Sequence, residues 1–155
     1  MKKRRGGPKP AARKRPAPAP AQVRVERRVE IRSDHDIVTA RQEGRLLAKQ
    51  AGFSDTNLTL IATAISELSR NILLYAREGS LTLGIVERNG QSGIAVIASD
   101  RGPGIPDLTR AMEVGYSTSG SLGLGLPGVR RLMDDFEVES RVGHGTRVTA
   151  RKWRP

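Results

Sequence analysis

The sequence has 155 residues, the size of one domain with a single hydrophobic core. Its formal net charge is +11, but residues 1–20 hold eight of the Lys and Arg residues and no acid, which leaves +3 for residues 21–155. This uneven charge argues against a nucleic-acid-binding domain. The absence of cysteine excludes disulfides, thiolate catalysis and cysteine-based zinc sites. No apolar run approaches the ~20 residues of a membrane helix and no signal peptide is indicated, so we expect a cytoplasmic protein.

Residues 1–21 are predicted to be a disordered basic tail, and residues 22–155 the folded domain. Five prolines fall within the first twenty residues, and repeated Pro-Ala steps favour an extended, solvated chain. A tether to nucleic acid or to another acidic surface is one interpretation of the tail. A solvated tail without a specific role is the interpretation we favour, because basic tails alone carry little information.

The domain is predicted to begin with a strand over residues 23–31, where apolar side chains alternate with charged ones. Ser33 and Asp34 are typical N-caps for a helix that runs to residue 51 and stops at Gly52. A second helix is predicted to start after Ser54 or Asp55. Its apolar residues repeat at helical spacing, and it is expected to end between residues 75 and 79.

The second half of the domain is predicted to be mostly strands. Asn89-Gly90 favours a tight hairpin between strands at residues 80–87 and 93–99. A Gly/Pro turn, a short segment at 108–112, a Gly/Ser-rich stretch and a helix at about 126–134 follow. Two last strands are expected at residues 136–140 and 146–153, separated by a turn at 143–145. These elements predict an α+β fold with one mixed, mostly antiparallel sheet and helices on one face.

Glu67 and Asn71 lie four residues apart on the second helix and therefore share one of its faces. An Asn amide oxygen is a suitable neutral ligand for Mg²⁺, and a carboxylate one turn away can act as a base. An ordinary polar helix edge is the alternative, and it is favoured for this pair on its own.

The strand that ends at Asp100 continues into Arg101-Gly102-Pro103-Gly104. An acid at a strand end can accept a hydrogen bond from a ligand, and glycines let the backbone approach that ligand closely. A plain β-turn has the same composition, so this motif alone stays ambiguous.

Gly123, Gly125 and Gly128 match the spacing of a dinucleotide-binding fingerprint, but no strand directly precedes them. The motifs of a eukaryotic-type kinase and of a Walker A loop are also absent. Glycines that lead into a helix N-terminus still favour an anion, and residues 116–122 suit a lid over a nucleotide. A flexible surface loop is the alternative.

In this order the three motifs resemble the Bergerat ATP-binding fold, a two-layer α/β sandwich shared by gyrase, Hsp90, sensor histidine kinases and MutL (the GHKL superfamily). The sequence is most similar to the small anti-sigma-factor serine kinases, and among them to the RsbT type of switch kinase. The resemblance covers about residues 23–153. It is carried by Asp36-Ile37-Val38, Ala40-Arg41, Gly44-Arg45, the run from Thr63 to Ile72 and the run from Gly123 to Val129.

The resemblance implies ATP and Mg²⁺ as cofactors and assigns roles to individual residues. Glu67 matches the acid that serves as the catalytic base, and Asn71 matches the residue that holds Mg²⁺. Asp100 matches the acid that accepts from the adenine amino group. The remaining matches are Gly102 and Gly104 at the adenine pocket, Gly123, Gly125 and Gly128 at the phosphates, and Gly145 and Thr146 beside the adenine.

The resemblance implies a serine/threonine-protein kinase of a bacterial partner-switching pathway, with a STAS-domain protein as substrate. The alternative is a binding switch, or anti-sigma factor, that captures a STAS protein or a sigma factor, or activates a PP2C-type phosphatase. The intact Glu67 and Asn71 favour the kinase. No membrane partner is expected, and nucleic acid would bind only weakly, through the tail.

Overall fold

The computed structural model describes residues 7, 19–113 and 125–155. Most of the predicted tail and the whole predicted lid lie outside these residues. The elements in chain order are β1 (Gln22–Ile31), α1 (Asp34–Gln50), α2 (Asp55–Ala76), β2 (Gly79–Arg88), β3 (Gln91–Asp100), α3 (Leu108–Ala111), α4 (Gly125–Leu132), β4 (Asp135–Arg141) and β5 (Gly145–Trp153). The expected elements are therefore confirmed, with ends that shift by one or two residues.

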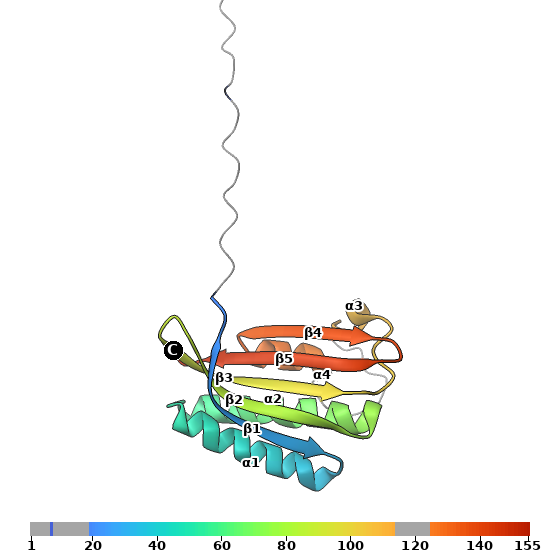
Figure 1. Cartoon of the computed structure of the whole chain (residues 1–155), viewed down its shortest axis with the longest axis horizontal. Coiled ribbons are helices and arrows are strands. Elements are labelled where there is room, and N and C mark those ends of the chain that lie inside the picture. Colours follow the sequence, from blue (N-terminus) through green and yellow to red (C-terminus); the bar gives the residue numbers. More distant parts are fainter. Residues whose placement is uncertain (1–6, 8–18, 114–124) are drawn as a thin grey trace, which may run out of the picture.

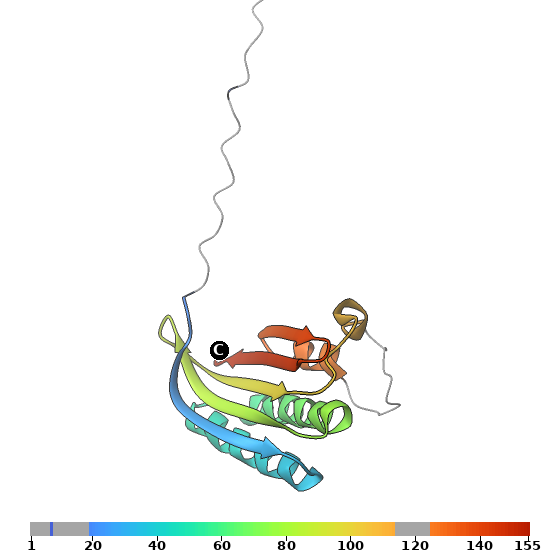
Figure 2. The same ribbon diagram turned by 45° about the vertical axis from the view of Figure 1, so that its right-hand side comes forward.

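The described strands form one five-stranded sheet in the order β1-β2-β3-β5-β4. Every pairing between them is antiparallel, including the sheet's two edges, where a mixed sheet was expected. Figures 1 and 2 show α1, α2 and α4 on the same side of this sheet. The α+β architecture with helices on one face is thus confirmed.

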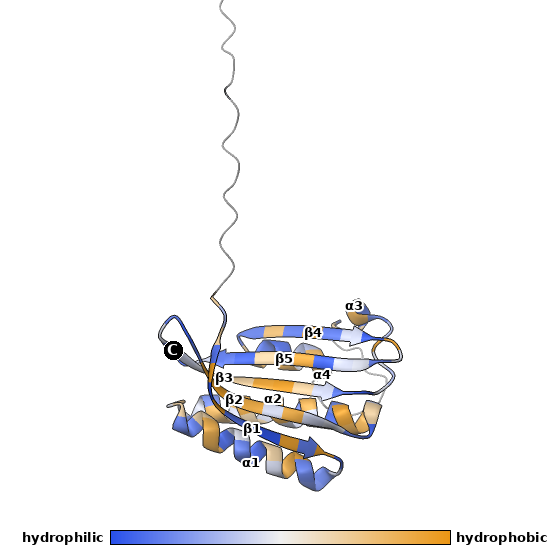
Figure 3. Ribbon diagram, viewed as in Figure 1, coloured by the Kyte–Doolittle hydropathy of each residue, from blue (hydrophilic) through white to orange (hydrophobic). Residues whose placement is uncertain are grey.

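The hydrophobic core lies between the sheet and the helices. Leu81 and Leu83 of β2 and Ile94 and Val96 of β3 are fully buried, and they alternate with residues on the opposite face of the sheet. Figure 3 shows hydrophobic residues concentrated in these middle strands, whereas the edge strand β4 is mostly hydrophilic. A charged edge discourages pairing with other chains.

The helix ends follow the sequence closely. Ser54 caps α2 by accepting a hydrogen bond from the Asn57 backbone N–H, and Asp36 accepts from the backbone N–H of Ser33 at the start of α1. Gly52 adopts a positive φ of 90° directly after α1, which only glycine does without strain. These ends position α2, the helix that carries Glu67 and Asn71, across the middle of the sheet.

The β2–β3 connection confirms the predicted hairpin. Asn89 and Gly90 have φ values of 51° and 77°, so both central residues lie in the left-handed region that a tight hairpin turn requires. The register continues without interruption from Arg88 and Gln91 to Gly79 and Asp100. Asp100 is consequently fixed at the end of a central strand.

Although α2 has 22 residues, no helix in the described ranges is long and apolar enough to span a membrane.

Candidate nucleotide site

The second half of α2 presents Glu67 and Asn71 one turn apart. Glu67 is largely buried, and its Oε1 accepts a hydrogen bond from Nη1 of Arg70 at 2.9 Å. This ion pair spans one helical turn and orients the carboxylate. The side-chain amide of Asn71 is partly exposed and makes no hydrogen bond within the described residues. An oriented carboxylate and an uncommitted amide thus share one face of the helix.

Asp100 lies where β3 meets β5, and its two carboxylate oxygens differ in their surroundings. Oδ1 accepts from the backbone N–H groups of Gly102 at 2.9 Å and Thr146 at 3.3 Å. Oδ2 accepts no hydrogen bond from the residues that the structure describes. The backbone bonds hold the carboxylate in place, and Oδ2 is left as an acceptor for an amino group such as that of adenine.

Ser140 connects Asp100 and Thr146 to the Gly/Pro turn. Its Oγ accepts from the backbone N–H of Ile105 at 2.7 Å and lies 2.8 Å from Oγ1 of Thr146. The same hydroxyl donates to the carbonyl of Gly145 at 3.2 Å. This network joins β4, β5 and the turn after β3 into one support for the Asp100 side chain.

Three glycines around Asp100 leave no room for a side chain. A Cβ on Gly102 would lie 2.6 Å from Cβ of Ala76, at the end of α2. Gly104 has a φ of 79° and approaches the carbonyl of Arg141, and Gly145 has a φ of 103° and approaches the carbonyl of Asp100. The backbone packs so closely at these three positions that only glycine, which has no Cβ, fits there. They also bring the end of α2 against the turn that follows Asp100.

Of the third predicted motif, the glycines that lead into a helix, the structure describes the part from Gly125 onward. Gly125 opens the described part of α4 with a φ of 62°, Gly128 is buried within α4, and Pro127 stands in its first turn, where proline is tolerated. α4 packs against α2, and Val129 and Leu126 bury their side chains in the core. Gly123 and the predicted lid lie outside the described residues.

The described site residues form two groups. Asp100, Gly102, Gly104, Gly145 and Thr146 lie together around the end of β3, whereas Glu67 and Asn71 lie on α2 beside α4. The Gly102–Ala76 contact connects them, because Ala76 ends the helix that carries Glu67 and Asn71.

Sequence reasoning missed Ser140 and Ala76. A serine within a strand and an alanine at a helix end resemble ordinary structural residues, so no local pattern identifies them.

ATP fits this arrangement of residues. The Oδ2 acceptor of Asp100 and the glycine backbone suit a flat base with an amino group. The amide of Asn71 has the hard, neutral oxygen that Mg²⁺ accepts as one of few protein ligands. The described residues contain no group of three or more His, Cys, Asp or Glu side chains placed to hold a metal ion.

Comparison with known proteins identifies the family. A profile of histidine kinase-, DNA gyrase B- and HSP90-like ATPases matches residues 56–154. The serine/threonine-protein kinase RsbT of Bacillus subtilis is 53% identical over 125 residues, which cover 81% of this chain and 94% of that kinase. An anti-sigma F factor of Caldanaerobacter subterraneus is 34% identical over 99 residues, which cover 60% of this chain and 68% of that factor.

A solved structure agrees on the fold. The structure of the RsbU and RsbW domains of a Mycobacterium tuberculosis protein superposes with a TM-score of 0.55 and 21% sequence identity. The match covers 90% of this chain and 34% of that protein, so this chain spans about a third of its length. At this identity the likeness concerns the fold alone.

Proposed function

The chain belongs to the family of histidine kinase-, DNA gyrase B- and HSP90-like ATPases, and we propose that it works as a serine/threonine-protein kinase in a bacterial partner-switching pathway. The kinase assignment follows from the 53% identity to RsbT, which extends over nearly the whole of that kinase. Its substrate, in this proposal, is a Ser or Thr hydroxyl of a STAS-domain protein.

ATP binds with its adenine at the end of β3. Oδ2 of Asp100 accepts from the adenine amino group, while Oδ1 stays bound to the backbone of Gly102 and Thr146. The bare backbone at Gly102 and Gly104 borders the base. Because Asp100 is held by two backbone N–H groups, it is oriented before the nucleotide arrives, which reduces the entropy that binding costs.

The phosphates lie between α2 and the start of α4. Gly125 and Gly128 supply backbone that approaches them closely, and Asn71 is the protein ligand for Mg²⁺. For Gly123, which lies outside the described residues, the same role rests on the sequence motif alone. When bound, the metal ion neutralises charge on the phosphate oxygens. The side-chain amide of Asn71 is suited to this role because no described residue uses it for another hydrogen bond.

Glu67 acts on the hydroxyl of the protein substrate. The carboxylate orients this hydroxyl and accepts its proton as the oxygen attacks the γ-phosphorus, and the bond between that phosphorus and the β–γ bridging oxygen breaks to release ADP. Arg70 holds Oε1 of Glu67, so Oε2 is the oxygen that faces the hydroxyl. The observation that carries the proposal is this buried, oriented carboxylate one turn from the uncommitted amide of Asn71.

The experiment is phosphoryl transfer with ATP labelled at the γ-phosphate. The full chain is incubated with Mg-ATP and with each STAS-domain protein encoded by the same genome. We expect one of these proteins to be labelled on Ser or Thr, and the label to disappear with N71A. If no candidate is labelled, although nucleotide-dependent binding to one of them persists, the protein is a binding switch.

The binding switch is the second candidate function, and the anti-sigma F factors among the relatives favour it. In this case the domain would capture a STAS protein or a sigma factor, or would activate a PP2C-type phosphatase after release. Phosphorylation and capture use the same nucleotide site, so a STAS protein that binds in the presence of ATP but is never labelled would distinguish the switch from the kinase.

A further inference from the structure

The segments around the proposed phosphate site carry very little positive charge. Residues 111–129, which include the predicted lid and the first residues of α4, contain no Lys or Arg. Among the 22 residues of α2, Arg70 is the single one. It directly precedes Asn71, the proposed ligand for Mg²⁺, and follows Glu67, the proposed base, by three residues. Mg²⁺ neutralises only part of the charge on a triphosphate, so a cation at this place on α2 has a role to fill.

The guanidinium of Arg70 is oriented by Glu67, but most of its donors stay uncommitted. Nη1 donates to Oε1 of Glu67 at 2.9 Å. None of the other N–H groups of Arg70 bonds a residue that the structure describes. The side chain of Arg70 is 44% exposed, whereas that of Glu67 is 10% exposed. A guanidinium holds its N–H groups in a planar fork, so the remaining ones can donate to a second anion while the first bond is kept.

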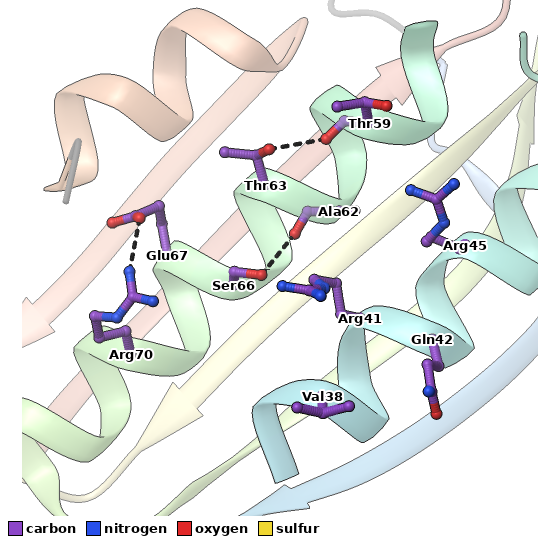
Figure 4. Close-up of a pocket in the computed structure, with 10 residues that line it drawn as sticks. All are labelled: Val38, Arg41, Gln42, Arg45, Thr59, Ala62, Thr63, Ser66, Glu67 and Arg70. Atoms are coloured by element: carbon purple, nitrogen blue, oxygen red, sulfur yellow. Dashed lines mark hydrogen bonds and ion pairs between the residues drawn. The ribbon is translucent and has the colours of Figure 1, made fainter. Parts of the chain in front are cut away.

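The ion pair points to the side of α2 on which the phosphates are proposed to lie. Figure 4 shows Glu67 and Arg70 extending from one side of α2, and α4, drawn in pale orange, passes on that side. α4 packs directly against α2. Arg41 and Arg45 belong to α1 and stand on the other side of α2 in this view. Of the arginines in this region, Arg70 is therefore the one that accompanies the base toward α4.

We propose that Arg70 bridges the base and the transferred group: Nη1 stays on Glu67, and its other N–H groups donate to an oxygen of the γ-phosphoryl group of ATP. The proposal rests on the proposed function, because it adds a residue to that reaction. Arg70 takes no proton and forms no covalent bond. It stabilises the negative charge on the γ-phosphoryl oxygens during transfer, and it keeps the carboxylate of Glu67 beside the phosphorus that the hydroxyl attacks.

A comparison of ATP with ADP tests this contact, because only ATP carries the γ-phosphoryl group. The affinities for a non-hydrolysable ATP analogue and for ADP, both with Mg²⁺, are measured for the full wild-type chain, R70M, R70K and E67Q. R70Q is a second variant without the charge, in which an amide can still donate to Glu67. The matched control is R131M, which removes the same charge from an exposed position at the far end of α4.

We expect R70M and R70Q to bind the ATP analogue about tenfold more weakly than wild type and to bind ADP equally well. R70K should recover part of the loss, because its ammonium keeps the charge but not the fork. R131M and E67Q should keep the wild-type ratio of the two affinities. E67Q/R70M should bind the analogue as weakly as R70M, since the contact with the phosphoryl group does not pass through Glu67.

Two results of the binding measurements would overturn the proposal. An unchanged ratio of the two affinities in R70M and R70Q would show that Arg70 acts only by orienting Glu67. An equal loss of analogue affinity in R131M would show that the effect comes from the net charge of the chain rather than from a contact of Arg70.

Phosphoryl transfer separates this contact from the proposed function. With saturating Mg-ATP and a STAS-domain protein that the wild type labels, R70M and R70Q should transfer the phosphoryl group on the order of 100-fold more slowly. Transfer at the wild-type rate would contradict the role of Arg70 and leave the kinase supported. If the wild type labels no STAS-domain protein, the proposed function fails, but the affinities for the ATP analogue and ADP still decide whether Arg70 contacts the γ-phosphoryl group.

Discussion

Oδ1 of Asp100 is engaged by two backbone N–H groups, and Oδ2 is available to a ligand. A substitution that replaces Oδ2 but keeps Oδ1 should therefore change nucleotide affinity without disturbing the backbone hydrogen bonds that support the fold. Asn provides such a change, because its carbonyl oxygen can keep both backbone hydrogen bonds while its amino group replaces Oδ2.

We predict that D100N weakens ATP binding about tenfold or more, since the amino group of the new side chain would face the adenine amino group and leave two donors without an acceptor. The melting temperature should change little. Fluorescence titration with an ATP analogue and thermal denaturation measure the two properties. Equal loss of nucleotide affinity and of stability would indicate that Asp100 acts only in folding.

The β4–β5 turn shows how one element supports the site. Gly143 and Gly145 both have positive φ values, 80° and 103°, but their surroundings differ. A Cβ on Gly143 would meet no atom within 4 Å, whereas a Cβ on Gly145 would collide with the backbone carbonyl of Asp100. The two positions therefore separate the cost of backbone strain from the cost of displacing the site.

For G143A we predict a loss of about 1 to 2 kcal/mol in the free energy of unfolding, from the left-handed backbone alone. For G145A we predict a larger loss, on the order of 3 kcal/mol or more, together with weaker ATP binding. Urea denaturation measures the free energy of unfolding of the two variants, and nucleotide titration measures their affinity for ATP. Equal effects of the two variants on ATP affinity would contradict the close packing of Gly145 against Asp100.

The start of α1 contains a carboxylate with a shifted pKa. The hydrogen bond from the Arg32 backbone N–H lowers the pKa of Asp36 below its usual value of 3.8, and the backbone N–H of Ser33 contributes in the same direction. A carboxyl group with a lowered pKa in the folded state stabilises the fold above its unfolded pKa, and this contribution disappears as the pH falls through the folded pKa.

Accordingly, D36N should lower the melting temperature at pH 7, because the charged acceptor at the helix start is lost. The difference between D36N and wild type should shrink as the pH falls below 3.8. Thermal denaturation of both proteins over a pH series measures this difference in melting temperature. A difference that stays constant down to the lowest pH would show that the charge of Asp36 makes no contribution.

Local patterns predicted the elements well because the relevant signals are local. Ser54, Gly52 and the Asn89-Gly90 pair act within a few residues of where they stand, and each has the predicted role. The strand order was not predictable in the same way. β5 pairs with both β3 and β4, and this long-range pairing depends on packing that no local pattern encodes.

At the scale of the whole molecule, the site is assembled from segments far apart in the chain. The order of the motifs on α2, after β3 and before α4 indicated a nucleotide site, but only the structure shows that Gly102 rests on Ala76 and that Asp100 accepts from Thr146. Ser140 joins this network through contacts with residues 105 and 146, so its role depends on the tertiary fold.

The domain boundary yields a prediction of its own. We propose that residues 22–155 are the kinase domain, because β1 begins at Gln22 and the following residues complete the sheet. Deletion of residues 1–21 should leave the melting temperature and the rate of phosphoryl transfer close to those of the full chain. If the deletion abolishes transfer, residues 1–21 take part in the reaction.

The role of Glu67 as the base of a protein kinase is tested most directly by single-turnover phosphoryl transfer from Mg-ATP to a STAS-domain protein, with E67Q in place of the wild type. Gln keeps the shape of the side chain but cannot accept the proton of the hydroxyl. We expect E67Q to bind ATP nearly as well as wild type but to transfer the phosphoryl group at least on the order of 100-fold more slowly, still to a Ser or Thr. Transfer by E67Q at the wild-type rate, or a label on another residue type, would contradict this role of Glu67.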